Sequence, residues 1–93
     1  MYYVYVLKMS NSTLYTGSTG DLQRRFREHK DGKVFSTKHK LPVTLLLYEA
    51  YALKSDAERR ERFLKTTEGK RLLKQQIRDI LIAEGITTQT TPP

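Results

Sequence analysis

Two tyrosines, an arginine, a histidine and a glutamate are the residues of this chain best suited to chemistry. Tyr5 and Tyr15 lie in two strand-like segments, and Arg25 and His29 are four residues apart, one turn of a helix. Glu61 comes later, at the edge of a second helical stripe. Phenols and an imidazole can move protons, a guanidinium can stabilise negative charge, and a carboxylate can hold a metal ion.

The first helical segment separates Arg25 and His29 from its other basic residues. At about 100° per residue, Leu22 and Phe26 centre the inner face of this helix. His29 borders that face and Arg25 lies beside His29, where a charge costs desolvation energy unless it is paired. Taken alone, this pattern is explained more simply by a structural role, with both side chains at the core border and bonded to backbone.

The other candidates also have structural explanations. Glu61 beside an apolar stripe needs a cation, which can be an arginine in a salt bridge or a bound metal ion. Tyr5 and Tyr15 fit strands, where tyrosine has good propensity. Gly17 and Gly20 flank a turn into a helix, where backbone N–H groups can hold a phosphate, but two glycines are a weak signal.

The elements that must position these residues follow from hydrophobic period and turn chemistry. Strands are predicted at residues 2–8, 13–17 and 43–51. Helices are predicted at about residues 21–31, at 55 to about 65, and from Thr66 or Thr67 up to Gly85. A basic loop at 33–40 connects the first helix to the third strand. The order β-β-α-β-α-α predicts an α/β (α+β) fold with a small three-stranded central sheet flanked by helices.

Local signals refine these boundaries. Both faces of the first strand are largely apolar, which predicts that it is the central one. Ser55 and Glu58 form a capping-box pattern at the start of the second helix, and Gly32 is a plausible C-cap of the first. We expect one domain over residues 1–85 and a disordered C-terminal tail at 86–93.

Composition limits the class of partner. The net charge of +7 and the pI of about 9.8 favour a polyanion, most often nucleic acid. Absence of cysteine excludes disulfides and zinc–thiolate sites. We identify no signal peptide and no apolar run of membrane-spanning length. We therefore expect a cytoplasmic protein that does not bind membranes and acts as a monomer.

Four short motifs, in order along the chain, resemble the GIY-YIG nuclease family. The motifs are Tyr3-Val4-Tyr5, Tyr15-Thr16-Gly17, Asp21-Leu22-x-x-Arg25-x-x-x-His29 and Ala57-x-x-x-Glu61-x-x-Leu64-Lys65. The resemblance covers roughly residues 2–66 and is strongest to the small stand-alone bacterial members. The chain also looks like the isolated catalytic module of the excision-repair nuclease subunit and of structure-specific endonucleases. A GIY-YIG nuclease-like fold is what this resemblance implies.

The resemblance also implies roles for the five candidates. Glu61 would hold one divalent cation, Mg²⁺ or Mn²⁺, and Arg25 would neutralise charge on the phosphate. Tyr5 and Tyr15 would orient and deprotonate the attacking water, with Tyr5 favoured as the base or its relay. His29 would position a tyrosine or share the proton transfer. A free tyrosine has a pKa of about 10, so it needs nearby cations to act as a base.

The chain departs from the family pattern in three places. Tyr3 begins the first triplet where the family has glycine, and Thr16 stands in the middle of the second. Ser18 occupies the position where the repair nuclease carries a lysine. Neither triplet change removes a group that the family is thought to need. The Ser18 difference leaves the expected site one cation poorer, which bears on the catalytic rate more than on the fold.

Nucleic-acid contacts are expected from two basic groups near the site. Gly17 would let the backbone approach a phosphate closely, and Ser18 follows it. The first basic group comprises Arg24, Arg27, Lys30, Lys33, Lys38 and Lys40. The second comprises Arg59, Arg60, Arg62 and Lys65. For any single lysine, a solvated surface position remains the simpler explanation.

These observations predict a metal-dependent DNA endonuclease that selects substrates by structure and acts in DNA repair or recombination. No base-reading element stands out, which disfavours sequence specificity, and RNA is not excluded as a substrate. The alternative is a nucleic-acid-binding module, or a nuclease subunit with little activity until a protein partner supplies specificity. A basic protein-interaction domain is the third hypothesis.

Overall fold

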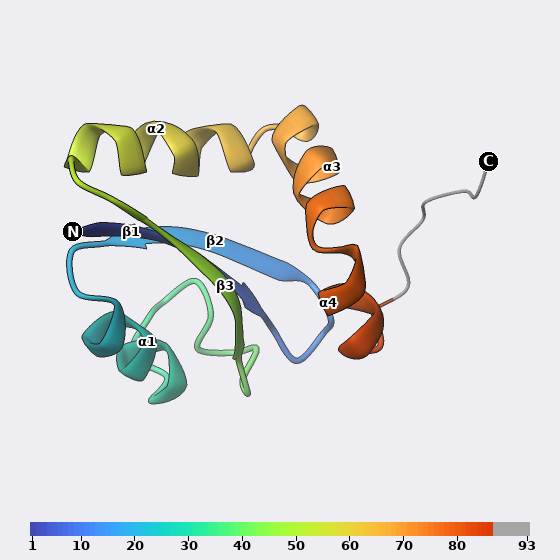
Figure 1. Ribbon diagram of the computed structural model, residues 1–93. Coiled ribbons are helices and arrows are strands. Elements are labelled where there is room, and N and C mark those ends of the chain that lie inside the picture. The colour runs from blue at the N-terminus through green and yellow to red at the C-terminus, as the bar shows by residue number, and fades with distance from the viewer. Residues whose placement is uncertain (87–93) are drawn as a thin grey trace.

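Residues 1–86 are described by a computed structural model of the chain (Figure 1). Of the predicted tail, residues 87–93 lie outside the described residues. No helix among residues 1–86 combines the length and the hydropathy needed to cross a membrane.

Three antiparallel strands form the sheet, in the spatial order β2-β1-β3. The strands are β1 (Tyr2–Lys8), β2 (Leu14–Thr19) and β3 (Thr44–Tyr51). The helices are α1 (Leu22–Lys30), α2 (Lys54–Leu64), α3 (Thr67–Gln76) and α4 (Arg78–Ala83). The predicted fold class, element order and central first strand are therefore confirmed.

The sheet separates two apolar cores. Val4 and Val6 of β1 pack toward α2, α3 and α4, while Tyr5 and Leu7 on the opposite face pack toward α1 and the loop that follows it. Figure 1 shows α2 on one side of the sheet and α1 on the other, with α3 and α4 at one end. Because side chains alternate along a strand, β1 supplies both cores, as a central strand buried on both faces must.

Of the two predicted helix-end signals, Gly32 is confirmed and the capping box is wrong. Gly32 follows α1 with φ of 73°. Asp21 caps the start of α1 by accepting from the backbone N–H of Arg24 at 3.1 Å, a bond that was not predicted. The Ser55 capping box does not form: α2 begins at Lys54, and its N-cap makes no side-chain bond. Packing of buried residues of α2 against the sheet fixes where the helix starts, and this leaves Ser55 inside its first turn.

The last predicted helix is two short helices that meet at Ile77. Thr66 caps α3 by accepting from the backbone N–H of Gly69, and Ile77 has φ −107° and ψ 28°, outside the helical range. Leu73, Ile77 and Leu81 are all buried in the same core. The break lets the chain bend around the end of the sheet while these three side chains stay on its apolar face.

Candidate functional site

A chain of two hydrogen bonds runs through the core between β1, α1 and the following loop. The hydroxyl of Tyr5 lies 2.8 Å from Nε2 of His29, and Nδ1 of His29 lies 2.8 Å from Oγ1 of Thr37. All three side chains are fully buried, with 1% or less of their surface exposed. The sequence predicted that His29 would border the core. In the structure His29 lies inside the core.

The direction of these bonds depends on where the imidazole carries its proton. Burial lowers the pKa of His29 to about 4, helped by the positive charge of Arg25, so the ring is neutral at pH 7. With the proton on Nδ1, the ring donates to Thr37 and Nε2 accepts from Tyr5. With the proton on Nε2, Thr37 donates and Tyr5 accepts. The first arrangement leaves a basic nitrogen facing the Tyr5 proton.

The depressed pKa of His29 makes stability depend on pH. The unfolded chain takes up a proton near pH 6.5 and the folded one only near pH 4, so stability is lost as pH falls through this window. The linked loss is about 3 kcal/mol in the free energy of unfolding. Urea denaturation at several pH values measures it. His29→Gln should flatten the profile between pH 6.5 and 4, whereas His39→Gln, at an exposed position, should not. Equal profiles for both variants would contradict this account.

Gly17 lets the two candidate tyrosines lie together. It pairs with Tyr5 across the β1–β2 ladder, and the Tyr15 ring lies 5.2 Å from the His29 ring and 6.3 Å from the Tyr5 ring. A Cβ atom at position 17 would stand 2.5 Å from the Tyr5 hydroxyl and 3.1 Å from the Tyr15 ring. Only glycine therefore leaves space for the buried phenol beneath β2.

Gly17→Ala is expected to lower the free energy of unfolding by about 1–3 kcal/mol, because the new methyl group overpacks the Tyr5 phenol. Gly20→Ala is the matched control, since its Cβ would meet Tyr2 at an ordinary 3.7 Å. Urea denaturation of both variants measures the difference. Comparable losses at the two positions would show that the close approach at Gly17 has no energetic consequence.

Burial controls the acidity of the Tyr5 phenol. Desolvation raises the pKa of Tyr5 to about 12, although the Arg25 guanidinium beside it acts in the opposite direction. Tyr5 is thus protonated at neutral pH and carries a hydrogen to donate. The expectation that nearby positive charge would bring this pKa down is not met by Arg25 alone.

Arg25 reaches the site from the half-buried side of α1. Its Nη1 donates to Oε1 of Glu28 at 3.0 Å, one turn along the helix. This ion pair uses one of the five N–H donors of the guanidinium. The remaining donors can bind an anion, and the planar group suits two phosphate oxygens at once.

Glu61 approaches the site from α2, across the edge strand β2. Its Oε1 accepts from the hydroxyl of Ser18 at 2.6 Å, and its Oε2 accepts from Nζ of Lys65 at 2.7 Å. Partial burial opposes ionisation, but the bonds from Lys65 and Ser18 outweigh it and lower the pKa of Glu61. The carboxylate is therefore ionised at neutral pH and already holds a cation.

These residues fit a weakly held divalent cation rather than a closed metal cage. No group of three or more His, Cys, Asp or Glu side chains suited to metal binding occurs among residues 1–86. Mg²⁺ often binds through one or two carboxylates, with water and substrate phosphates completing its shell. Glu61 provides the carboxylate and Ser18 a neighbouring hydroxyl. The Lys65 ammonium, on a half-exposed side chain, already pairs with this carboxylate.

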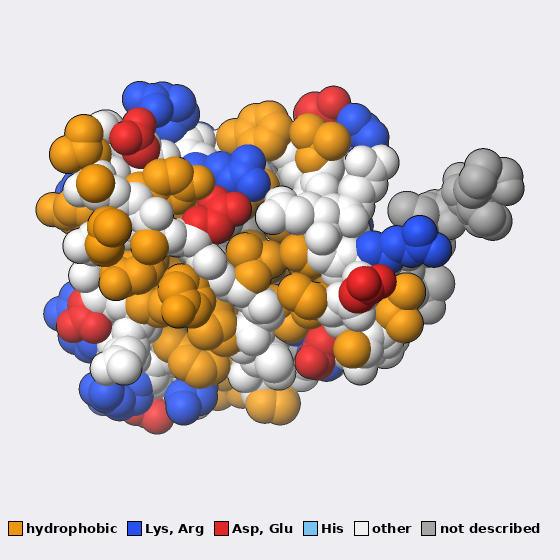
Figure 2. Space-filling model, in the orientation of Figure 1, with side chains coloured by type: hydrophobic (Ala, Val, Ile, Leu, Met, Phe, Trp, Pro, Cys, Tyr) orange, Lys and Arg blue, Asp and Glu red, His pale blue; other side chains and the backbone are white. Residues whose placement is uncertain are grey.

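The two predicted basic groups differ in how much of their charge is paired. In the second group, Arg59 binds Asp56 and Arg60 binds Glu49, so much of its charge is neutralised. The first group lies on α1 and the following loop, and its residues are exposed. Ion pairs between described residues involve only one of its members, Arg24, at 4.0 Å from Asp21. On the face seen in Figure 2, basic side chains form separate groups around a largely apolar middle.

Two residues contact the candidate site in ways that were not predicted from the sequence. Thr37 bonds to His29, and Lys65 bonds to Glu61. Thr37 lies in the segment that was predicted as a polar loop, yet it and Val34 are buried. Their three-residue spacing is the only trace of a buried turn in that basic segment. Lys65 was predicted as one of several phosphate-binding cations, and its pairing with Glu61 follows from the i, i+4 position on α2.

Comparison with known proteins gives one family. The family model described as the GIY-YIG catalytic domain matches residues 1–76. A UPF0213 protein of Streptococcus agalactiae is 47% identical over 64 residues, which are 68% of this chain and 73% of that protein. A UPF0213 protein of Haloquadratum walsbyi is 39% identical over 82 residues, which are 85% of this chain and 92% of that protein.

A solved structure supports the same relationship. The solution NMR structure of a UPF0213 protein from Bacillus halodurans is similar to this chain, with a TM-score of 0.53 and 32% sequence identity. The similarity covers 82% of this chain and 85% of that one.

Proposed function

Because this chain belongs to the GIY-YIG family, we propose that it is a metal-dependent endonuclease that hydrolyses phosphodiester bonds in DNA. The observation that carries the proposal is the Tyr5–His29 hydrogen bond of 2.8 Å, with Tyr15 packed against it and Arg25 close to the phenol. Glu61, the proposed ligand of Mg²⁺ or Mn²⁺, lies across the adjacent edge strand through its bond to Ser18.

Tyr5 acts as a proton relay in this proposal. A phenol with a pKa of about 12 is a poor base at neutral pH, but it can accept a proton from water while passing its own to Nε2 of His29. The water becomes the attacking hydroxide, and the Tyr5–His29 pair carries the proton only until the leaving oxygen takes it up, because burial lowers the pKa of His29 to about 4. Thr37 holds the ring in place by accepting from Nδ1–H throughout the transfer.

The other candidates orient the substrate. Arg25 binds two non-bridging oxygens of the scissile phosphate and stabilises their developing charge. Tyr15 positions the attacking water on the side opposite to the leaving oxygen. The divalent cation, when held by Glu61, supplies Lewis-acid stabilisation of the phosphate and of the leaving oxygen. The basic group on α1 and its loop attracts the DNA backbone.

The biological setting is part of the same proposal. With no base-reading element identified, the enzyme selects DNA by structure and serves repair or recombination. It acts as a monomer in the cytoplasm, with a protein partner adding specificity where required.

A nucleic-acid-binding module is the second candidate, and two observations favour it. The pKa of Tyr5 is raised, and the Glu61 carboxylate is occupied by Lys65. A substrate panel separates the two functions: nicked, branched and single-stranded DNA, each with Mg²⁺, Mn²⁺ or EDTA. The proposal predicts cleavage only with a cation and its loss in Arg25→Ala. Salt-sensitive binding without cleavage, intact in Arg25→Ala, would establish the module instead.

A further inference from the structure

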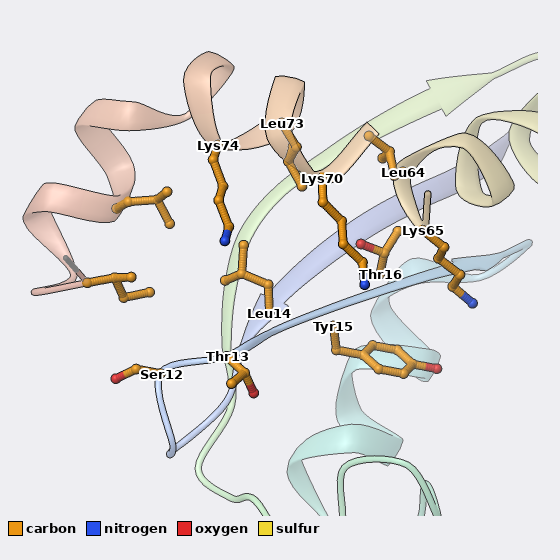
Figure 3. A pocket seen from close by; sticks show the side chains of 12 residues that line it. Ser12, Thr13, Leu14, Tyr15, Thr16, Leu64, Lys65, Lys70, Leu73 and Lys74 are labelled. Carbon is orange, nitrogen blue, oxygen red and sulfur yellow. The ribbon is translucent and has the colours of Figure 1, made fainter. Parts of the chain in front are cut away.

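A cavity of about 490 Å³ opens between β2 and α3, next to the candidate site (Figure 3). Its volume falls in the range of about 300–1,000 Å³ that is typical of small-molecule sites. Its apolar lining comprises the half-buried Leu14 and three leucines that are almost fully buried, Leu64, Leu73 and Leu81.

Two lysines face this cavity without an acidic partner. Figure 3 shows Lys70 and Lys74 extending from α3 across the opening toward β2. None of the side chains that line the cavity is acidic, and neither lysine takes part in an ion pair between residues 1–86. Arg71 follows Lys70 in the sequence but does not line the cavity, and it is paired with Glu68. The positive charge over the apolar wall is therefore available to an anionic ligand.

The cavity borders the candidate site across β2. Tyr15 belongs to its lining, while its ring lies on the α1 side of β2 and packs against His29 (Figure 3). Lys65 lines it as well and donates to Glu61. A ligand in the cavity thus lies directly beside the group that would hold the metal ion.

We propose that this cavity binds one unpaired nucleotide of the DNA strand, next to the phosphate that is cut. The inference rests on the proposed function for its position relative to the cut. The phosphate of this nucleotide binds Lys70 and Lys74, its base packs on Leu14 and the apolar lining around it, and the hydroxyl of Thr16 bonds to polar groups of the nucleotide.

The need for an unpaired base makes the cavity selective. A paired base is stacked within the duplex, so it can enter only after unpairing, which costs a few kcal/mol. A flap or a branch offers a base that is already free. The cavity therefore favours DNA with a single-stranded segment beside the cut, which gives the proposed structure selectivity a physical origin.

A DNA-binding measurement tests the inference under conditions in which no cleavage occurs. A fluorescent single-stranded hexanucleotide is titrated in EDTA with wild type, with Lys70→Ala/Lys74→Ala and with the control Arg71→Ala/Arg78→Ala. The control removes equal charge from exposed positions, one on α3 and one at the start of α4, that do not line the cavity. We expect affinity at 0.1 M salt to fall at least about tenfold in the first variant, and the slope of log Kd against log salt to fall by about 1.4. The control should lose less than about twofold.

NMR locates the ligand in the same titration. The methyl signals of Leu14 and Leu73 should shift on addition of the hexanucleotide, because both side chains line the cavity. Equal losses of affinity in the two double variants, or unshifted methyl signals, would overturn the inference. Shifted methyl signals and a selective loss of affinity, in a protein that cuts no DNA, would sustain the cavity as a nucleotide site and reject the proposed nuclease function. Cleavage with no preference for flaps would sustain the proposed nuclease function and reject the cavity as a nucleotide site.

Discussion

Glu61→Gln is expected to reduce kcat for DNA cleavage by a factor of about 10³ or more, because it removes the carboxylate that holds the cation. Glutamine has the same shape and can still accept from Ser18, so the fold and the contact with β2 are preserved. The affinity for Mn²⁺ should fall in parallel, and isothermal titration calorimetry measures it. Lost metal binding together with lost cleavage would tie the effect to the ion rather than to packing.

Glu58→Gln is the matched control for this prediction. Glu58 lies on the same helix, one turn before Glu61, and carries the same charge. It forms no ion pair with the residues that the structure describes. We expect cleavage within about twofold of wild type, as for surface substitutions away from special features. A loss as large as that of Glu61→Gln would mean that the charge of α2, and not a specific ligand, supports the activity.

Tyr5→Phe is expected to lower kcat by about 10²–10⁴, the usual contribution of a positioned proton-transfer group. The change removes only the hydroxyl, which is the donor to Nε2 of His29 when the ring carries its proton on Nδ1. Substrate affinity should change little, because the buried phenol lies beneath Gly17 rather than at the surface. Single-turnover cleavage and anisotropy binding measure the two effects separately.

Tyr3→Phe controls for the loss of a phenol from β1. Tyr3 lies on the same face two residues earlier and packs edge to face on Tyr48, away from His29. Its cleavage rate should equal that of wild type. If Tyr5→Phe cut DNA at the wild-type rate, the relay through His29 would be refuted even though the family assignment would stand.

The fold could be predicted from the sequence because its signals are local. Three examples are the alternation along β1, the Leu22–Phe26 stripe and the cap at Thr66. Each acts within a few residues, and packing agrees with them. The break at Ile77 could not be predicted, since it follows from fitting three core side chains around the end of the sheet. The capping box at Ser55 failed for the same reason: tertiary packing sets where α2 begins.

The sequence could single out the residues of the candidate site, but it could not predict the hydrogen bonds between them. Helical projection singled out Arg25, His29 and Glu61, yet it gave no sign that Thr37 would bond to the imidazole, since that contact depends on how the loop folds. The family resemblance implied that the tyrosines lie near positive charge, but it did not reveal how strongly burial raises the pKa of Tyr5.

The serine at position 18 has an explanation in the structure. Where the resemblance to the repair nuclease leads one to expect a lysine, Ser18 instead donates to Glu61, and the adjacent cation is Lys65 from the end of α2. A positive group therefore still stands at this carboxylate, supplied by a different element. The site is less depleted of charge than the sequence suggested.

Cleavage of a labelled flap DNA by purified protein, with Mn²⁺ and with EDTA, tests the central claim most directly. The wild type, Tyr5→Phe and Glu61→Gln are compared at equal, saturating concentrations. The account predicts cation-dependent cutting by the wild type and rates at least about a hundredfold lower in both variants, with all three binding the DNA. Cutting that persists in EDTA, or at the wild-type rate in both variants, would contradict it.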